Sequence, residues 1–338
     1  MDRKTRVYNA MMGKPVDRIP FSFWYHFTGD HAKGEACVKA HMDYYQRSKV
    51  DYMKIMSDGF MGPQAYDVQK VSDWAKIKPL GKNCDYYRGQ VERAKRINEE
   101  LKGDCLTFYN IFAPFTIMRW AGDEMVMAHL REDEQTTRKG LEVITEDVAT
   151  LVRGLIEEAG CTGIYLSLQA GEKTRFTYDE YRRIVMPSDL TALNAANALS
   201  DINIAHLCGW AGDANNLELW RDYPARAFNW AISIDKMSLI EGREFFGGKT
   251  TVIGGFDNRK EALLYKNGTK EEIKAFAKKI VLDYEAACGT RDGLIIGADC
   301  TIWFDVDDTR FAWVLEALEE IWPAGKIWYC PRGGVRIQ

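Results

Sequence analysis

The sequence predicts an α/β fold, a single (β/α)8 TIM barrel, and two features carry this prediction. Short apolar and β-branched runs recur along the chain, and helical patterns fill the intervals between them. No Pro/Gly/Ser-rich linker divides the 338 residues, and a barrel of this type needs about 250. We therefore expect one domain over residues 1–338, with an N-terminal segment at 1–18 and a C-terminal tail at 324–338.

Eight runs predict the strands of the barrel. Most are nearly continuous in apolar residues, as expected of parallel strands that are buried on both faces. In chain order they are 19–26, 51–56, 105–113, 163–168, 202–208, 228–234, 250–256 and 294–300. The alternative fold is a doubly wound open sheet, which usually carries a Gly-rich phosphate-binding turn after its first strand. No such turn follows residues 19–26, so the barrel is favoured.

Helices are expected between these strands. Apolar residues recur at helical spacing over 141–156, and Gly160 stands where that helix would end. A second pattern over 181–199 is interrupted near Pro187. The remaining helical patterns that we single out are 270–287 and 311–321.

Composition and charge narrow the class of protein. The chain is 46% apolar and 28% charged, which is ordinary for a globular protein. Its formal net charge of -4 gives no general attraction to nucleic acid or anionic lipid, and we expect neither as a partner. Residues 1–6 are polar and no apolar run reaches membrane-spanning length. We expect a cytoplasmic protein whose cysteines are mostly reduced.

His206, Cys208 and Cys300 form a candidate zinc site. His206 and Cys208 are two residues apart at the end of a strand, so alternation turns both side chains the same way. Cys300 ends another strand, and the carboxyl ends of barrel strands share the rim that carries the active site. Three protein ligands leave one zinc position open for chemistry. Each residue alone also fits a hydrogen-bonded histidine or an inert buried cysteine.

Other polar and aromatic residues are expected at the same rim. His26 is the candidate catalytic acid or base, and a histidine bonded to backbone is its alternative. Asp235 and Asp257 are candidates for the fourth metal position, with a catalytic role assigned to Asp257, unless they cap helices. Alternation turns Asp299 away from the rim. The candidate substrate-binding residues are Trp24, Tyr109, Tyr165, Gln169, Trp210, Asn229 and Asp235.

Several segments resemble the uroporphyrinogen decarboxylase family. They are GKPVDRIPFSFW at 13–24, SDW at 72–74, HLCG at 206–209, GGFDN at 254–258 and IIGADC at 295–300. The similarity extends from Thr5 to about Pro323, and the resemblance implies a TIM barrel.

One branch of this family implies a cofactor and a partner. It contains zinc methyltransferases that work with methylated corrinoid proteins, and their His-x-Cys…Cys motif falls on His206, Cys208 and Cys300. The resemblance implies Zn2+, a corrinoid (methylcobalamin) supplied by a partner protein, and a small-molecule methyl donor or acceptor. It also suggests a homodimer.

The other branch contains cofactor-free decarboxylases and fits less well. Their substrate bears many carboxylates, which calls for arginine forks, and the family has an Arg-rich segment of the RQAGR type after its first strand. Here no arginine occurs between Arg18 and Arg47. A decarboxylase-like lyase and a non-catalytic, metal-dependent binding protein remain as alternatives.

Overall fold

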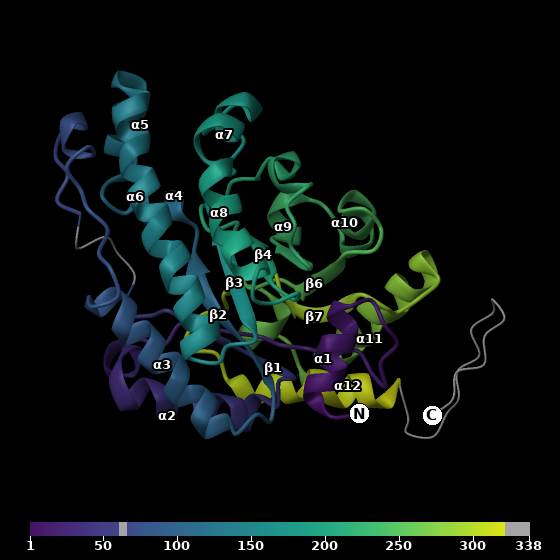
Figure 1. The fold of residues 1–338 in the computed structure, drawn as a ribbon. Helices are drawn as coiled ribbons and strands as arrows, with labels where there is room; N and C mark the ends of the chain where they lie inside the picture. Colours follow the sequence, from purple (N-terminus) through teal and green to yellow (C-terminus); the bar gives the residue numbers. More distant parts are fainter. Residues whose placement is uncertain (61–65, 322–338) are drawn as a thin grey trace.

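The computed structural model describes residues 1–60 and 66–321, in which parallel strands form one curved sheet with helices around it (Figure 1). The strands are β1 Tyr52–Ile55, β2 Leu106–Phe112, β3 Gly163–Leu168, β4 Ile204–Leu207, β5 Ala227–Trp230, β6 Thr251–Phe256 and β7 Leu294–Ala298. Each strand pairs with its neighbours in chain order, so the sheet runs β1-β2-β3-β4-β5-β6-β7. This order confirms the α/β TIM-barrel prediction.

The prediction of a regular strand at 19–26 is wrong. This segment is extended and makes only isolated bridges, one of them between Phe21 and Ile296 of β7. The N–H of Ser22 donates to the Ile296 carbonyl at 3.0 Å, and the N–H of Asp51 donates to the Phe21 carbonyl at 2.9 Å. The segment therefore occupies the eighth position, between β7 and β1. It contains a proline, which has no N–H for a continuous ladder.

The other seven predicted strands are present, most of them shorter at one or both ends than predicted, and one ends in a helix. The run 228–234 belongs to a strand only as far as Trp230, and a single helical turn, α9 (Ile232–Asp235), takes up its end. Short apolar runs do not distinguish a strand from a buried helical turn by periodicity, which explains the error.

The helices lie outside the sheet. They are α1 Arg3–Met11, α2 Gly34–Ser48, α3 Asp85–Leu101, α4 Pro114–Arg119, α5 Asp123–Glu132, α6 Glu134–Arg153, α7 Tyr178–Ile184, α8 Met186–Asn197, α9 Ile232–Asp235, α10 Leu239–Phe245, α11 Lys270–Cys288 and α12 Phe311–Glu320. Short 3-10 or π turns lie at Gly29–Ala32, Val71–Asp73, Gly154–Glu158, Leu217–Trp220, Leu263–Asn267 and Asp308–Arg310.

The predicted helices are confirmed. The 141–156 pattern lies in α6 and its π-turn extension, which ends just before Gly160, a glycine with φ +77. The predicted interruption separates α7 from α8, and Pro187 stands in the first turn of α8, where its missing N–H costs nothing. The patterns at 270–287 and 311–321 correspond to α11 and α12.

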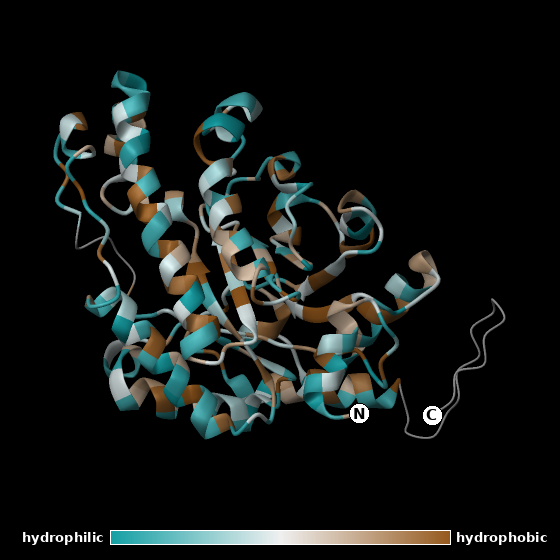
Figure 2. Cartoon of the chain, in the orientation of Figure 1, coloured by the Kyte–Doolittle hydropathy of each residue, from teal (hydrophilic) through white to brown (hydrophobic). Residues whose placement is uncertain are grey.

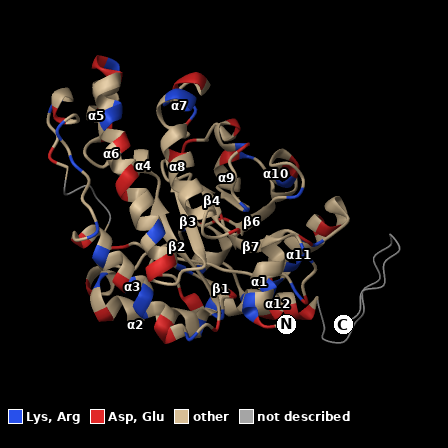
Figure 3. Ribbon diagram, in the orientation of Figure 1, with Lys and Arg blue, Asp and Glu red and all other residues tan. Residues whose placement is uncertain are grey.

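Burial follows the layers of the barrel. Apolar residues concentrate in the strands (Figure 2), and charged residues of both signs are interspersed over the helices (Figure 3). No helix among the described residues is long and apolar enough to cross a membrane. The predicted C-terminal tail at 324–338 lies outside the described residues.

Candidate metal centre

The structure brings His206, Cys208 and Cys300 together. One ligand atom from each side chain lies within 4.8 Å of the other two. The Cys208 and Cys300 sulfurs are 3.7 Å apart, and the Cys300 sulfur is 3.4 Å from Nε2 of His206. The carboxyl ends of β4 and β7 thus place three potential ligand atoms around one point of the barrel rim.

These separations fit a tetrahedral zinc site. Zn–S bonds of about 2.3 Å and Zn–N bonds of about 2.0 Å at tetrahedral angles give S···S near 3.8 Å and S···N near 3.5 Å. The observed 3.7 and 3.4 Å are within about 0.1 Å of these estimates. The type, number and spacing of the candidate ligands therefore suit a tetrahedral zinc ion with one open coordination position.

Asn229 in β5 fixes the tautomer and orientation of His206. Its Nδ2 donates to the carbonyls of Ile253 (2.9 Å) and Ala298 (3.0 Å), so its Oδ1 must face Nδ1 of His206, at 2.6 Å. An amide oxygen only accepts, so the hydrogen of the imidazole is on Nδ1. The Nε2 lone pair is consequently free for a metal, which is the second-shell arrangement usual for ligating histidines.

The two thiols are electrostatically coupled. A hydrogen bond from Cys208 lowers the pKa of Cys300 well below that of an ordinary cysteine, and the same bond raises the pKa of Cys208 well above it. Cys300 is therefore the more acidic of the two thiols. A divalent cation is the species that would allow both sulfurs to be thiolates at once.

Aromatic and amide side chains form the walls of the cluster. Trp24 lies edge-on to the His206 ring at 6.5 Å between centroids, and Tyr165 lies tilted at 5.8 Å. Gln169 donates from Nε2 to the Cys208 sulfur at 3.4 Å. The structure places these three predicted residues beside the candidate ligands.

Lys54 of β1 is a neighbour of this cluster that we did not expect from the sequence. Its side chain is buried, with Nζ 3.9 Å from the centre of the Tyr165 ring and 4.4 Å from that of Trp24. Burial lowers the pKa of Lys54 to about 7, and the Cys300 and Cys208 thiolates act in the opposite direction. The signal in the sequence is a lysine in the middle of the apolar run DYMKIM.

His26 lies at the rim, paired with Asp58. Its Nδ1 is 2.6 Å from Oδ1 of Asp58, whose other oxygen accepts the N–H of Phe27 at 2.8 Å. The His26 side chain is 39% exposed, whereas that of Asp58 is 5% exposed. The histidine was expected from the sequence and the carboxylate was not, because the two are 32 residues apart and meet only in the folded barrel.

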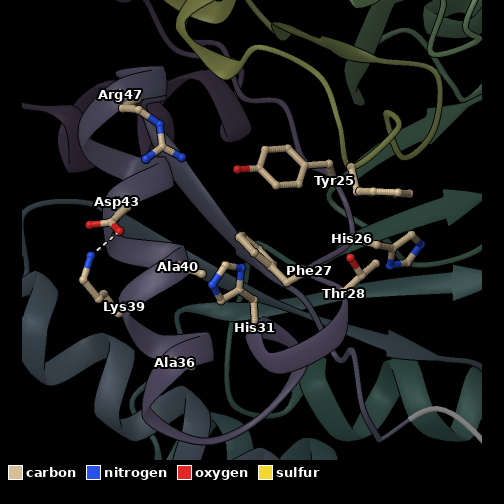
Figure 4. Close-up of a pocket in the computed structure, with 11 residues that line it drawn as sticks. Tyr25, His26, Phe27, Thr28, His31, Ala36, Lys39, Ala40, Asp43 and Arg47 are labelled. Carbon is tan, nitrogen blue, oxygen red and sulfur yellow. Dashed lines mark hydrogen bonds and ion pairs between the residues drawn. The ribbon is translucent and has the colours of Figure 1, made fainter.

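A pocket of about 420 Å³ opens beside His26, between the 25–31 segment and α2 (Figure 4). Its wall includes Tyr25, Arg47 and Phe304, but none of the three cluster residues. The guanidinium of Arg47 makes two hydrogen bonds of 2.8 Å to Asp308. The pocket is therefore separate from the metal cluster, and its arginine is already paired.

Tyr109 is not placed as predicted. Its neighbour Phe108 packs edge-on against Tyr52 at 5.3 Å, on the face of β1 that also carries Lys54. Tyr109 is buried on the opposite face of β2; burial raises its pKa, and the groups that act on it include Arg93 of α3 and a cysteine of α2. It faces the helical layer and not the rim.

The two predicted aspartates are engaged in local interactions. Asp235 accepts the N–H of Asn215 at 2.8 Å, and this bond holds the loop that follows β4. Asp257 accepts the N–H of Arg259 at 2.9 Å and forms an ion pair with its guanidinium. Burial alone would raise the pKa of Asp257, but the bonds from Arg259 outweigh it and lower the pKa. Neither belongs to the three-residue metal cluster.

Two further residues complete the rim. Trp210 is 52% exposed, and the guanidinium of Arg119 lies 5.1 Å from the centre of its ring. Asp299 is buried and accepts the N–H of Ser233 at 2.9 Å, which turns it toward α9 as alternation predicts. Burial raises the pKa of Asp299 to about 7.

The chain is an α/β barrel with a His/Cys/Cys cluster at the carboxyl ends of its strands. This is the edge at which enzymes with this fold carry their active sites. The sequence profile named uroporphyrinogen decarboxylase (URO-D) matches residues 2–321, and the chain belongs to that family. No curated protein matches the chain.

Two solved structures superpose on the chain at low sequence identity. A structure described as a methyltransferase from Methanosarcina mazei superposes with a TM-score of 0.72 at 17% identity, covering 95% of this chain and 99% of that one. A β-mannanase from the blue mussel Mytilus edulis superposes with a TM-score of 0.48 at 10% identity, covering 89% and 92%. At 17% identity, the similarity to the Methanosarcina mazei structure shows a common fold alone.

Proposed function

We propose that this protein is a zinc-dependent methyltransferase that moves a methyl group between a corrinoid held by a partner protein and a small substrate. The observation that carries the proposal is the convergence of the His206, Cys208 and Cys300 ligand atoms within 4.8 Å. Membership in the URO-D family and the fold shared with a structure described as a methyltransferase support it.

The chain's own residues have separate tasks in this proposal. Asn229 holds His206 with Nε2 directed at the metal, and Gln169 donates to the Cys208 sulfur. Bound zinc would supply Lewis acidity, which lowers the pKa of a thiol or polarises a heteroatom that carries a methyl group. Trp24 and Tyr165 exclude water around this position.

His26 and Asp58 form the proton-transfer group of the proposal. The Asp58 carboxylate fixes the orientation of the imidazole through Nδ1, so the other ring nitrogen is free to exchange a proton. The partial exposure of His26 lets that proton pass to solvent. Trp210 at the same rim would contact the partner or the substrate; Asp235 supports the loop that carries Trp210.

Cofactor-free decarboxylation has less support. Recognition of several carboxylates requires free arginines, and Arg18 and Arg47 flank the relevant segment. Arg18 makes bonds of 2.6 and 2.8 Å to the buried Asp51, and Arg47 is paired with Asp308. Neither guanidinium is available in this arrangement.

Metal analysis combined with a methyl-transfer assay tests the proposal. The protein is purified under reducing, chelator-free conditions, its zinc content is measured, and the cobalamin spectrum is followed with free methylcobalamin. About one zinc per chain together with methyl transfer supports the proposal. Zinc without methyl transfer would favour a metal-dependent binding protein, and absence of zinc would overturn the central claim.

A further inference from the structure

Lys54 presents an energetic problem that the proposed function does not explain. Its side chain is 2% exposed, and it makes no hydrogen bond or ion pair with any residue in the described ranges 1–60 and 66–321. An unpaired charge in a protein interior is costly, and interiors normally neutralise it or pair it. A lysine in the middle of a buried strand therefore needs a reason outside packing.

The surroundings of Lys54 connect it to the metal cluster. Its Nζ lies over the rings of Trp24 and Tyr165, at 4.4 and 3.9 Å from their centres. The same two rings flank His206 at 6.5 and 5.8 Å. Lys54 and His206 thus lie against the same two rings, and ring faces provide only part of the stabilisation that an ion pair gives.

The two thiolates compensate the charge of Lys54 only as long as no cation is bound. A divalent cation bound by two thiolates and a neutral imidazole has no net charge. The Asp58 carboxylate also acts on Lys54 but is hydrogen-bonded to His26, so the open fourth position is where a further counter-charge can enter. An anionic atom there would be attracted to Lys54, whereas a cationic group would be repelled.

Building on the proposed function, we propose that Lys54 is a specificity-determining residue that selects substrates whose metal-facing atom is anionic. A thiolate is the first example of such a substrate, and a phenolate has the same chemistry. Quaternary ammonium methyl donors are disfavoured, because their positive charge would approach a buried ammonium. The preference for anionic over cationic substrates therefore depends on Lys54 of β1.

A purely structural lysine would behave differently in a stability measurement. Lys54→Met keeps the length of the side chain and its contact with the two rings but removes the charge. If Lys54 serves substrate selection, its removal relieves an unpaired buried charge in the zinc-loaded protein, where the metal neutralises the thiolates, and the melting temperature of that zinc-loaded protein rises by about 2 °C or more. If Lys54 serves packing, the melting temperature falls.

Anion binding to the cobalt-substituted protein tests the selection directly. Co2+ replaces zinc, and its visible spectrum reports ligands at the open position. Thiocyanate is the permanently anionic probe, 2-mercaptoethanol is the thiol probe and imidazole is the neutral probe. In Lys54→Met we expect thiocyanate and 2-mercaptoethanol to bind at least about tenfold more weakly, with imidazole unchanged within about twofold.

Two further variants control for charge and for folding. Lys54→Arg keeps the positive charge and is expected to recover most of the thiocyanate affinity. Lys279→Met removes an exposed lysine that pairs with Asp283 on α11, and it should match the wild type with all three probes.

The failures of the two proposals are distinguishable. A wild-type protein that takes up no Co2+ at the His/Cys/Cys cluster would overturn the proposed function and this inference together. A normal cobalt spectrum with equal thiocyanate affinities in Lys54→Met and wild type would overturn the inference alone. A lower melting temperature of Lys54→Met would also overturn it.

Discussion

The rim of the barrel carries two polar groups that are held in different ways. The first, the His206/Cys208/Cys300 cluster, is assembled from the ends of two strands, and its histidine is locked by Asn229. The second, the His26–Asp58 pair, stands on an irregular segment beside an open pocket. A rigid, enclosed cluster suits a ligand that stays in place, whereas an accessible pair suits a group that exchanges protons.

Replacement of Cys300 is expected to have the largest effect on zinc affinity, and it changes only the first of the two groups, the His206/Cys208/Cys300 cluster. Cys300→Ser removes one of three ligands, so zinc affinity should fall by more than the roughly 10–100-fold typical of second-shell changes. Zinc content after dialysis against a weak chelator measures this. Cys288→Ser, at the end of α11 and outside the cluster, should retain about one zinc per chain. Full zinc retention in Cys300→Ser would exclude the site.

Removal of the Asn229 side chain tests the locking of the histidine. Asn229→Ala frees Nδ1 of His206, and zinc affinity should fall about 10–100-fold. The carbonyls of Ile253 and Ala298 also lose a buried donor, which should cost about 1–3 kcal/mol of metal-free stability. Competition with a chromophoric chelator and urea unfolding give the two values. A stability loss without any change in zinc affinity would make Asn229 a purely structural residue.

The sequence predicted the barrel because burial on both faces leaves a strong apolar signal in parallel strands. It failed at 19–26, where the hydrogen bonds to β7 and to Asp51 decide the structure and neither partner is near in sequence. It also failed at the end of the run 228–234, where a helical turn and a strand have the same apolar pattern.

The sequence predicted those residues of the candidate site that lie at the ends of strands. His206, Cys208 and Cys300 converge because the positions of their strands in the barrel fix where those strands end. Asp58 follows β1 and was missed, because its link to His26 is a tertiary contact with no local pattern. Tyr109 was misplaced because both faces of β2 are buried, so its sequence does not show which face points into the barrel.

The His26–Asp58 pair should be separable from the candidate metal cluster by mutation. Asp58→Asn keeps an acceptor but removes the charge that orients His26, so methyl-transfer rates should fall by about tenfold to a hundredfold. Zinc content should be unchanged, because neither residue belongs to the cluster. Rates with methylcobalamin and metal analysis of the same sample measure both. Loss of zinc in Asp58→Asn would contradict the separation of the two groups.

Trp210 is expected to have the smallest effect, although it lies only two residues after Cys208. The indole is 52% exposed, and its recorded partner among the described residues is the guanidinium of Arg119. Asp123 and the Gln169 carbonyl hold that guanidinium independently. Trp210→Ala should therefore cost only about 0.5–1 kcal/mol of stability, the value of one exposed cation–π contact.

The same variant distinguishes the rim from the cluster. In Trp210→Ala, zinc content and the rate with free methylcobalamin should match the wild type, because the bond that Trp210 makes to Cys208 comes from its backbone, and the side-chain contact of Trp210 is to Arg119. Association with a corrinoid protein should weaken, since an exposed aromatic at a rim is a typical anchor for a partner. A loss of zinc would instead place Trp210 within the enclosed cluster, and sequence proximity to Cys208 would then have been the better guide.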